Sequence, residues 1–327
     1  AKKSVSLDLK SPQGQQIFHD LARHADVIVE NMSDGTVERL GVDYETIRKI
    51  NPRLVYCSIT GLGRPSPFPG VKAMDITVQA LSGAMDTTGY QDGPPMRFGL
   101  PISDLLAPLY GTIGIQAALR QREATGEGQN IVVSMLDCLT SLLPFEHFDV
   151  FRAMGFPARS GNHHNRLAPF GVYPTKDGHV SIAAANDAWA AAIFEAMGRP
   201  ELARDPRFSS RGPRAVNADA LNALIEDWTR QHDSASVIEA LHGRHGVPCV
   251  PVRTADEALS DPAMFASGAL QKLAHPETGE IEAVASGIRS ACRARRSGST
   301  GPRRFWAATM PRSMRASWGS MPRPWRR

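Results

Sequence analysis

One carboxylate in this 327-residue sequence lies where its ionised, nucleophilic form would be favoured. Asp104 follows the turn sequence Gly99-Leu100-Pro101 and lies at the start of a predicted helix from about Ser103 to Glu123. The positive end of a helix dipole stabilises the charged, nucleophilic form of a carboxyl group in the first turn. An aspartate at such a position is more often only a stabilising charge, so the pattern alone favours a structural role.

Other polar residues carry weaker signals. Lys10, Arg39 and Lys72 are possible partners for phosphate groups, although a single basic residue is usually a solvated surface charge. The pair His163-His164 lacks the helical i, i+4 spacing and the nearby carboxylates of a zinc site, so we expect a loop and no metal. Gly61-Leu62-Gly63 lacks the third glycine of a dinucleotide-binding motif and indicates a turn.

These residues lie among elements that alternate between strand and helix. We expect strands at 5–9, 26–30 and 54–60, with helices after Ser11-Pro12 and over 43–50. This order predicts a doubly wound α/β layer with a parallel sheet, in which ligands bind beyond the carboxyl ends of the strands. The residues at those ends are 8–10, 31–33 and 60–64.

The rest of the chain continues this pattern. The long helix carries small residues where another backbone can approach closely: Ala107, Gly111, Gly114 and Ala118. A strand over QNIVVSML follows this helix. Beyond a His-, Asn-, Gly- and Pro-rich stretch, strands at 178–185 and 246–252 and helices at 187–197 and 218–231 predict a second, smaller α/β unit.

Charge is distributed unevenly along the sequence. Residues 289–327 contain 11 Arg and no Lys, Asp or Glu, which leaves 26 basic and 33 acidic residues in the first 288, a net charge of −7. An acidic body argues against nucleic-acid binding. We find no apolar run near the roughly 20 residues that cross a bilayer, no signal peptide and no disulfide pattern among four scattered cysteines, so we expect a cytoplasmic protein without membrane contact.

A series of colinear segments over about residues 1–285 resembles one known family, the family III CoA-transferases, which include formyl-CoA transferase, carnitine CoA-transferase and the α-methylacyl-CoA racemases. The segments are KKSVSLDLKSPQG, ADVIVENMSDGTVERLG, INPRLVYCSITGLG, DITVQALSGAMDTTGYQDGPP, GLPISDLLAPLYGTIGIQAALRQREATGEGQ, SGNHHNRLAPFGVYPTKDGHV, DPRFSS and HGVPCVPV. The resemblance implies an interlaced homodimer with a Rossmann-like large domain and a smaller α/β domain. The implied division is a CoA-binding large domain at 1–158, a linker at 159–176, a small domain at 177–260, a return segment at 261–288 and a basic tail at 289–327.

The resemblance also implies a mechanism. The aspartate at the position of Asp104 attacks an acyl-CoA thioester to give an acyl anhydride and free CoA, and an aspartyl-CoA thioester follows before a carboxylic acid takes the CoA. Acyl-CoA and the acid are substrates, and no cofactor is held permanently. The residues implied to contact CoA are Leu7, Asp8, Leu9, Lys10, Asn31, Met32, Ser33, Arg39, Lys72, Ala73, Met74 and Asp75.

Two alternatives to a CoA-transferase remain at this stage. The related racemases have a histidine before the residue that corresponds to Asp75, where this sequence has Met74. Because a thioether accepts no proton, transfer is favoured over racemisation. The other alternative is an inactive remnant, since family members begin with a strand, helix and strand that precede residue 1.

Two further departures from the family limit the prediction. Formyl-CoA transferase carries a glycine run at the loop aligned with 163–166, where this sequence has His-His-Asn-Arg. An oxalate-specific enzyme of the formyl-CoA type is therefore doubtful. A succinyl-CoA-dependent enzyme, or one with another dicarboxylate or carnitine-like substrate, is as plausible as an oxalate enzyme. The Arg-, Ser-, Pro- and Trp-rich tail has the composition of a disordered basic extension or of a nucleic-acid-binding arm. Our hypothesis is that it is the product of a frameshift.

Overall fold

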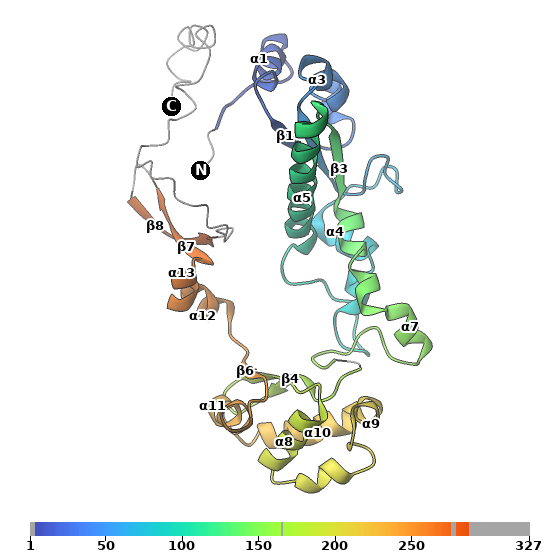
Figure 1. The fold of residues 1–327 in the computed structure, drawn as a ribbon, viewed down its shortest axis with the longest axis vertical. Helices are drawn as coiled ribbons and strands as arrows, with labels where there is room; N and C mark the ends of the chain where they lie inside the picture. The colour runs from blue at the N-terminus through green and yellow to red at the C-terminus, as the bar shows by residue number, and fades with distance from the viewer. Residues whose placement is uncertain (1–3, 165, 276–278, 288–327) are drawn as a thin grey trace. The chain divides into compact units, whose positions relative to one another are not determined.

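The computed structural model describes residues 4–164, 166–275 and 279–287. It divides into two compact units, residues 1–252 and 253–327, which are described separately (Figure 1).

The first unit begins with a three-stranded parallel sheet in the order β1-β2-β3. Its strands are β1 (Val27–Glu30), β2 (Val55–Thr60) and β3 (Asn130–Ser134). Val27 pairs with Val55, and Tyr56 pairs with Asn130, so the three carboxyl ends lie at one edge. The predicted parallel α/β layer is confirmed.

Helices cover both faces of this sheet because side chains alternate along β2. Tyr56 packs with residues of α1 (Pro12–Ala22) and α3 (Tyr44–Ile50). The next residue, Cys57, packs with residues of α5 (Ile102–Thr125) and α6 (Met135–Thr140). The remaining elements of this part are α2 (Thr36–Arg39), α4 (Asp75–Leu81), η1 (Ala84–Thr87), η2 (Leu143–Glu146) and α7 (Phe148–Ala153).

The segment before α1 differs from the prediction. We expected a strand over 5–9, but residues 4–8 have no regular structure, and residues 9 and 10 form a turn. The apolar alternation of VSLDL is present, yet among the described residues no strand pairs with it. A strand needs a hydrogen-bonded neighbour as well as a suitable sequence.

The long helix α5 lies against β2 and β3 as well as α4 and α6 (Figure 1). Ala107, Gly111 and Ala118 are buried, and a Cβ at Gly114 would lie 3.1 Å from Cγ2 of Ile131. The predicted close approach through small residues is therefore confirmed. By length and composition alone α5 could cross a membrane, but one of its faces packs against the sheet, α4 and α6.

A second sheet in the same unit is antiparallel, in the order β4-β5-β6. Its strands are β4 (Phe170–Pro174), β5 (His179–Ala183) and β6 (Cys249–Pro251). The helical elements beside it are α8 (Asp187–Ala196), η3 (Pro200–Arg204), α9 (Arg211–Val216), α10 (Ala218–Thr229), α11 (Ser234–Ile238) and the π-helical turn η4 (Glu239–Gly243). β4 begins inside the segment that we expected to be a linker, 159–176. Its Gly and Pro content hid an edge strand, where proline is tolerated.

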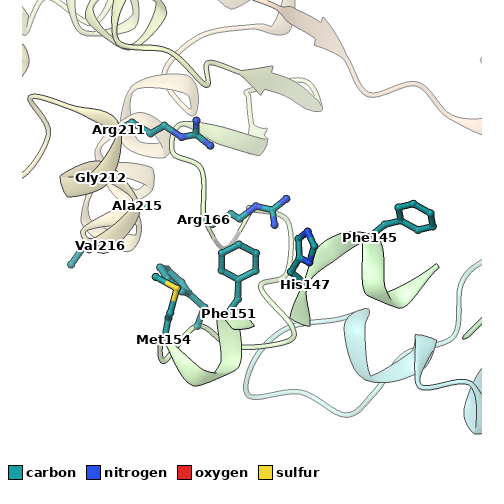
Figure 2. A pocket seen from close by; sticks show the side chains of 10 residues that line it. Phe145, His147, Phe151, Met154, Arg166, Arg211, Gly212, Ala215 and Val216 are labelled. Atoms are coloured by element: carbon teal, nitrogen blue, oxygen red, sulfur yellow. The ribbon is translucent and has the colours of Figure 1, made fainter. Parts of the chain in front are cut away.

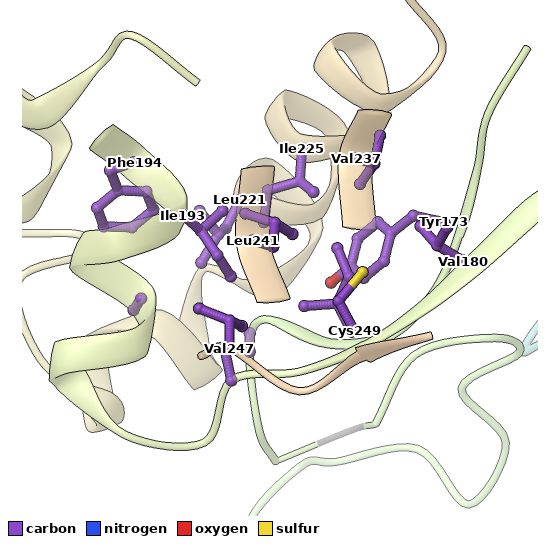
Figure 3. Packing of buried hydrophobic residues seen from close by; sticks show 14 of the residues in the cluster. Tyr173, Val180, Ile193, Phe194, Leu221, Ile225, Val237, Leu241, Val247 and Cys249 are labelled. Atoms are coloured by element: carbon purple, nitrogen blue, oxygen red, sulfur yellow. The ribbon is translucent and has the colours of Figure 1, made fainter. Parts of the chain in front are cut away.

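The core of this smaller domain is formed by buried side chains from both sheet and helices (Figure 3). Tyr173 and Val180 of the sheet meet Ile193, Leu221 and Ile225 of the helices, all essentially inaccessible to water. A buried guanidinium lies beside this core. Arg214 donates hydrogen bonds to the carbonyl oxygens of Ala168 and Phe208 and pairs with Asp187 at 2.6 Å, which satisfies its charge.

The second unit contains α12 (Ala255–Ser260), α13 (Pro262–Ser267) and an antiparallel hairpin of β7 (Leu270–His275) and β8 (Gly279–Ser286). The register of the hairpin shifts between Lys272 and Ala274. The hairpin falls in the predicted return segment, 261–288. The predicted basic tail, 289–327, lies outside the described residues.

The three described cysteines, Cys57, Cys138 and Cys249, are buried and free. Burial raises the pKa of each thiol, to about 11 for Cys249. Their location in the cores explains their scattered spacing in the sequence, which carries no disulfide or metal pattern.

Candidate active site at the carboxyl edge of the parallel sheet

Asp104 lies in the first turn of α5, as predicted, and its side chain is exposed in the isolated chain. Pro101 precedes the helix and provides no side-chain cap. The cap comes instead from another helix, since the Asp75 carboxylate accepts the Ser103 backbone N–H at 2.9 Å and the Ser103 hydroxyl at 2.7 Å. Asp75 thus fixes the turn that carries Asp104.

Gln79 holds Asp75 in this position from one turn further along α4. Its Nε2 donates to Oδ2 of Asp75 at 2.7 Å, and its Oε1 accepts the backbone N–H of Phe98 at 2.8 Å. Nε2 also lies 3.5 Å from the Leu100 carbonyl oxygen. Gln79 is buried, with 1% of its surface exposed, so α4 and the segment that leads into α5 are joined by a shielded amide.

The two carboxyl groups have opposite pKa shifts. Burial acts to raise the pKa of Asp75, but hydrogen bonds from Ser103, Gln79 and the Asp104 backbone together lower it. Burial and the negative charge of Asp75 raise the pKa of Asp104. These two effects on the Asp104 pKa act against the helix dipole, which favours the ionised form in the first turn.

The predicted CoA-contacting segment from Lys72 to Asp75 lies at the end of β2. A Cβ at Gly61, directly after β2, would overlap the Cβ of Ala73. The backbone N–H of Leu136, after β3, donates to the Gly61 carbonyl oxygen at 3.0 Å. The ends of β2 and β3, the start of α4 and the first turn of α5 are therefore neighbours.

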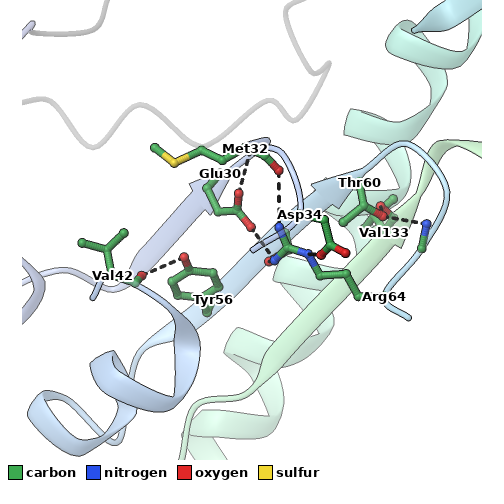
Figure 4. A network of polar contacts seen from close by, with 10 residues as sticks. Glu30, Met32, Asp34, Val42, Tyr56, Thr60, Arg64 and Val133 are labelled. Carbon is green, nitrogen blue, oxygen red and sulfur yellow. Dashed lines mark hydrogen bonds and ion pairs between the residues drawn. The ribbon is translucent and has the colours of Figure 1, made fainter. Parts of the chain in front are cut away.

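Asn31, Met32 and Ser33 follow β1 at the same edge and are exposed. A partly buried ion pair supports them: Nη1 of Arg64 lies 3.1 Å from Oε1 of Glu30, whose other oxygen accepts the Met32 N–H at 2.7 Å (Figure 4). Arg64 comes from the end of β2, so the loop after one strand is held by the loop after the next. The sequence interpretation placed Arg64 at a strand end but did not identify this contact.

The remaining predicted CoA contacts are less closely tied to Asp104. Asp8 accepts the Ser11 N–H at 3.1 Å and the Lys10 N–H through its side chain at 3.0 Å, at the start of α1. Leu7 and Leu9 are half-buried, and Lys10 is exposed. Arg39, at the end of α2, donates to the Thr36 hydroxyl at 2.9 Å. Within the described part of the chain, no hydrogen bond or ion pair joins these residues to Asp75 or Asp104.

Two cavities lie elsewhere in the first unit, and Asp104 lines neither. One, of about 610 Å³, is largely apolar, and the guanidinium of Arg166 stacks 4.6 Å from the ring centre of Phe151 (Figure 2). The other, of about 390 Å³, is lined by Tyr90, His163 and Glu226 among others. Nε2 of His163 lies 3.7 Å from Glu226, and burial lowers the pKa of this histidine. His163 and His164 thus lie in a loop region, as expected, next to β4.

Sequence reasoning missed Gln79 and Ser103. The signals were present, because Gln79 stands four residues after Asp75 on one helix face and Ser103 immediately precedes Asp104. Among the residues described, no group of three or more His, Cys, Asp or Glu side chains is arranged to hold a metal ion.

The same arrangement of elements is found in solved structures. A CaiB/BaiF family protein from Brucella suis superimposes with a TM-score of 0.73 at 32% identity, over 85% of this chain and 76% of that one. The model of CoA-transferase family III matches residues 1–303, and the chain belongs to this family. The match extends into residues 289–303, beyond the point where we expected the family pattern to end.

Two curated relatives give the scale of the similarity. The chain is 38% identical over 265 residues to a succinyl-CoA:mesaconate CoA-transferase of Haloarcula hispanica, and 39% identical over 272 residues to an acetyl-CoA:oxalate CoA-transferase of Acetobacter aceti. These alignments cover 80% and 83% of this chain. They span 66% and 70% of the length of the relatives.

Proposed function

We propose that this protein transfers CoA from an acyl-CoA to a carboxylic acid and that Asp104 is the nucleophile. The observation that carries the proposal is the position of Asp104 on an exposed first helical turn, fixed by Asp75 at the carboxyl edge of the sheet. Family membership supports the reaction class.

The proposed first step forms a bond between a carboxylate oxygen of Asp104 and the thioester carbonyl carbon. The C–S bond breaks, and CoA leaves as a thiolate with the bonding electrons. The thiolate then attacks the Asp104 carbonyl of the anhydride, which releases the donor acid as its carboxylate and leaves an aspartyl-CoA thioester. Attack by the acceptor carboxylate releases CoA thiolate again, and the thiolate captures the acceptor acyl group from the new anhydride.

The electrostatics of Asp104 suit this sequence. A carboxylate with a raised pKa is a stronger base and a better nucleophile once it is ionised. Acylation removes its charge and so relieves the repulsion by Asp75, which favours the covalent intermediate over the free carboxylate.

We infer that CoA binds along the carboxyl edge. Asn31 to Ser33 and Lys72 to Asp75 provide exposed polar and cationic groups there, and Lys10 and Arg39 add positive charge for phosphates. The relatives are named for succinyl-CoA, acetyl-CoA, mesaconate and oxalate, so we propose a dicarboxylic acid as one of the two exchange partners.

Racemisation is the alternative that Met74 argues against. Its side chain is 69% exposed at the start of α4, directly before Asp75. A proton transfer across the α-carbon needs a base and an acid, and a thioether supplies neither. We therefore propose acyl transfer for this site.

Trapping the intermediate tests the proposal. The protein is incubated with succinyl-CoA or acetyl-CoA, then with hydroxylamine, and peptides are analysed by mass spectrometry. We expect a hydroxamate at Asp104 and none in Asp104→Asn. Asp137→Asn is the matched control, because Asp137 is an exposed carboxylate in the first turn of α6. No adduct, combined with exchange of the α-proton of a branched acyl-CoA in deuterated water, would replace the proposal with racemisation; absence of CoA binding would indicate a chain without catalytic function.

A further inference from the structure

Gln79 has no role in the chemical steps of the proposed reaction. It reaches neither Asp104 nor the exposed edge, yet it is buried and uses both ends of its amide. One end binds the carboxylate that caps α5, and the other binds the main chain at Phe98, six residues before Asp104.

We propose that Gln79 is a positioning residue that fixes Asp104 in its reactive geometry by holding Asp75 and the Phe98–Leu100 segment at the same time. The proposal rests on the function proposed for Asp104. Gln79 acts through Asp75 and Ser103, and it touches no reacting atom.

The hydrogen bonds form a ladder in which donors converge on the Asp75 carboxylate from both sides. Phe98 N–H donates to Gln79 Oε1, Gln79 Nε2 donates to Asp75 Oδ2, and Ser103 donates twice to Asp75 Oδ1. Both oxygens of Asp75 are therefore occupied by donors, which orients the carboxylate and keeps it ionised. Since the ladder ends on the residue before Asp104, a shift at Gln79 is transmitted to the nucleophile.

The direction of the ladder also explains why glutamine rather than glutamate suits this position. A carboxylate at residue 79 would accept the Phe98 N–H but would face the Asp75 carboxylate without a proton between them. An apolar side chain would leave both the Phe98 N–H and one Asp75 oxygen without their buried partner.

The experiment measures the rate of Asp104 acylation by succinyl-CoA under single-turnover conditions, together with the apparent affinity for succinyl-CoA and the thermal midpoint. Gln79→Met preserves the length of the side chain and removes its polar atoms. We expect acylation to slow by roughly tenfold to a hundredfold with unchanged affinity, because small displacements of a reacting group cost this much. Gln231→Met, at an exposed position just after α10, is the control and should change nothing.

A second comparison keeps the test decisive if Gln79→Met does not fold. In Asp75→Asn, the new amide nitrogen faces Gln79 Nε2, so two donors oppose each other. The double variant Asp75→Asn with Gln79→Glu restores an acceptor at both contacts, and we expect it to acylate roughly tenfold faster than Asp75→Asn alone.

The outcomes separate this inference from the proposed function. Equal rates for Gln79→Met and the unaltered protein, or for the double and the single variant, would overturn the positioning role while Asp104 is still labelled. A loss of affinity in proportion to the loss of rate would assign Gln79 to substrate binding instead and would also overturn it. Failure to label Asp104 in the unaltered protein would remove the proposed function itself.

Discussion

At the scale of single residues, Asp75 and Asp104 show how identical side chains acquire different properties. Asp75 accepts donors at both oxygens, which lowers its pKa, whereas Asp104 has a charged neighbour and partial burial, which raise its pKa. A difference of this kind within a pair of carboxyl groups is typical of functional sites. Two predictions follow from the direction of these shifts.

The first concerns the pH dependence of acylation. Because Asp104 must be ionised to react, the rate should fall as the pH drops through its raised pKa. Asp75→Asn removes the like charge, lowers the pKa of Asp104 and should move this acid limb to lower pH, even though acylation at neutral pH is slower. Single-turnover rates across the acidic range provide the measurement; an unmoved limb would show that the charge of Asp75 does not act on Asp104.

The second concerns stability. The folded-state pKa of Asp104 is raised, so folding favours its neutral form, and stability declines as the pH rises through that pKa. Asp104→Asn should therefore melt at a higher temperature than the unaltered protein at neutral pH, with the difference vanishing in acid where both side chains are neutral. Melting temperatures recorded against pH decide this, and a lower melting temperature at neutral pH would contradict it.

At the scale of elements, the close approach of the end of β2 to the start of α4 is a steric constraint on function. Gly61→Ala would place its Cβ on that of Ala73 and push the Lys72–Asp75 segment outward. We expect a loss of about 1–3 kcal/mol of stability and slower acylation of Asp104.

The control for this change is Gly212→Ala in α9, where a Cβ meets nothing within 4 Å. It should be neutral or slightly stabilising. Denaturant unfolding and the hydroxylamine assay compare the two variants, and a Gly61→Ala protein that matches the control in both would show that the contact is not restrictive.

Much of the element pattern could be predicted from sequence. The parallel sheet, α1, α3, α5, α8 and α10 follow from hydrophobic periodicity and from caps, such as Ser11 of α1 and Asp43 of α3, that act within a few residues. The positions of Asp104 and of the strand-end segments could be predicted as well. What failed required information from distant parts of the chain: the 5–9 segment has strand character but no partner, and β4 is defined by pairing with β5.

The details of the site show the same limit. Local pattern placed Asp104 on a helix N-terminus and predicted the effect of the dipole, but it did not reveal that Asp75 lies beside it. Ser103 and Asp104 stand 28 and 29 positions after Asp75 in the sequence, and the hydrogen bonds from Ser103 to Asp75 bring the two carboxyl groups together. Burial, the larger cause, and this neighbour both raise the pKa of Asp104, and the local pattern indicates neither of them.

At the scale of the whole molecule, α5 has an apolar face that no described element of the first unit covers. Leu105, Leu109 and Ile113 are spaced by four residues and are 51%, 58% and 68% exposed. Parallel sheets are normally covered by further structure, and exposed apolar stripes of this kind mark interfaces. The homodimer that we predict from family resemblance would bury such a face.

Ile113→Glu tests this prediction. If the face is buried between two copies, the charge should raise the dissociation constant of the dimer roughly tenfold to a hundredfold. This is the effect of losing about 1.5–3 kcal/mol of apolar burial. Sedimentation velocity over a range of protein concentrations measures the effect, and Val216→Glu, at an exposed apolar position of α9 away from this face, serves as the control. A dimer unaffected by Ile113→Glu would place the interface elsewhere.

The buried cysteines have a practical consequence for a protein proposed to form a transient CoA thiolate. Mixed disulfides and alkylation both require an accessible thiolate, and Cys57, Cys138 and Cys249 are shielded and have raised pKa values. These three thiols should contribute almost no background to a thiol-reactive dye while the protein remains folded. In a Cys292→Ser background, since Cys292 lies outside the described residues, such a dye can therefore trap any CoA thiolate that escapes before it attacks the anhydride. The slow appearance of additional signal would report unfolding in the same cuvette.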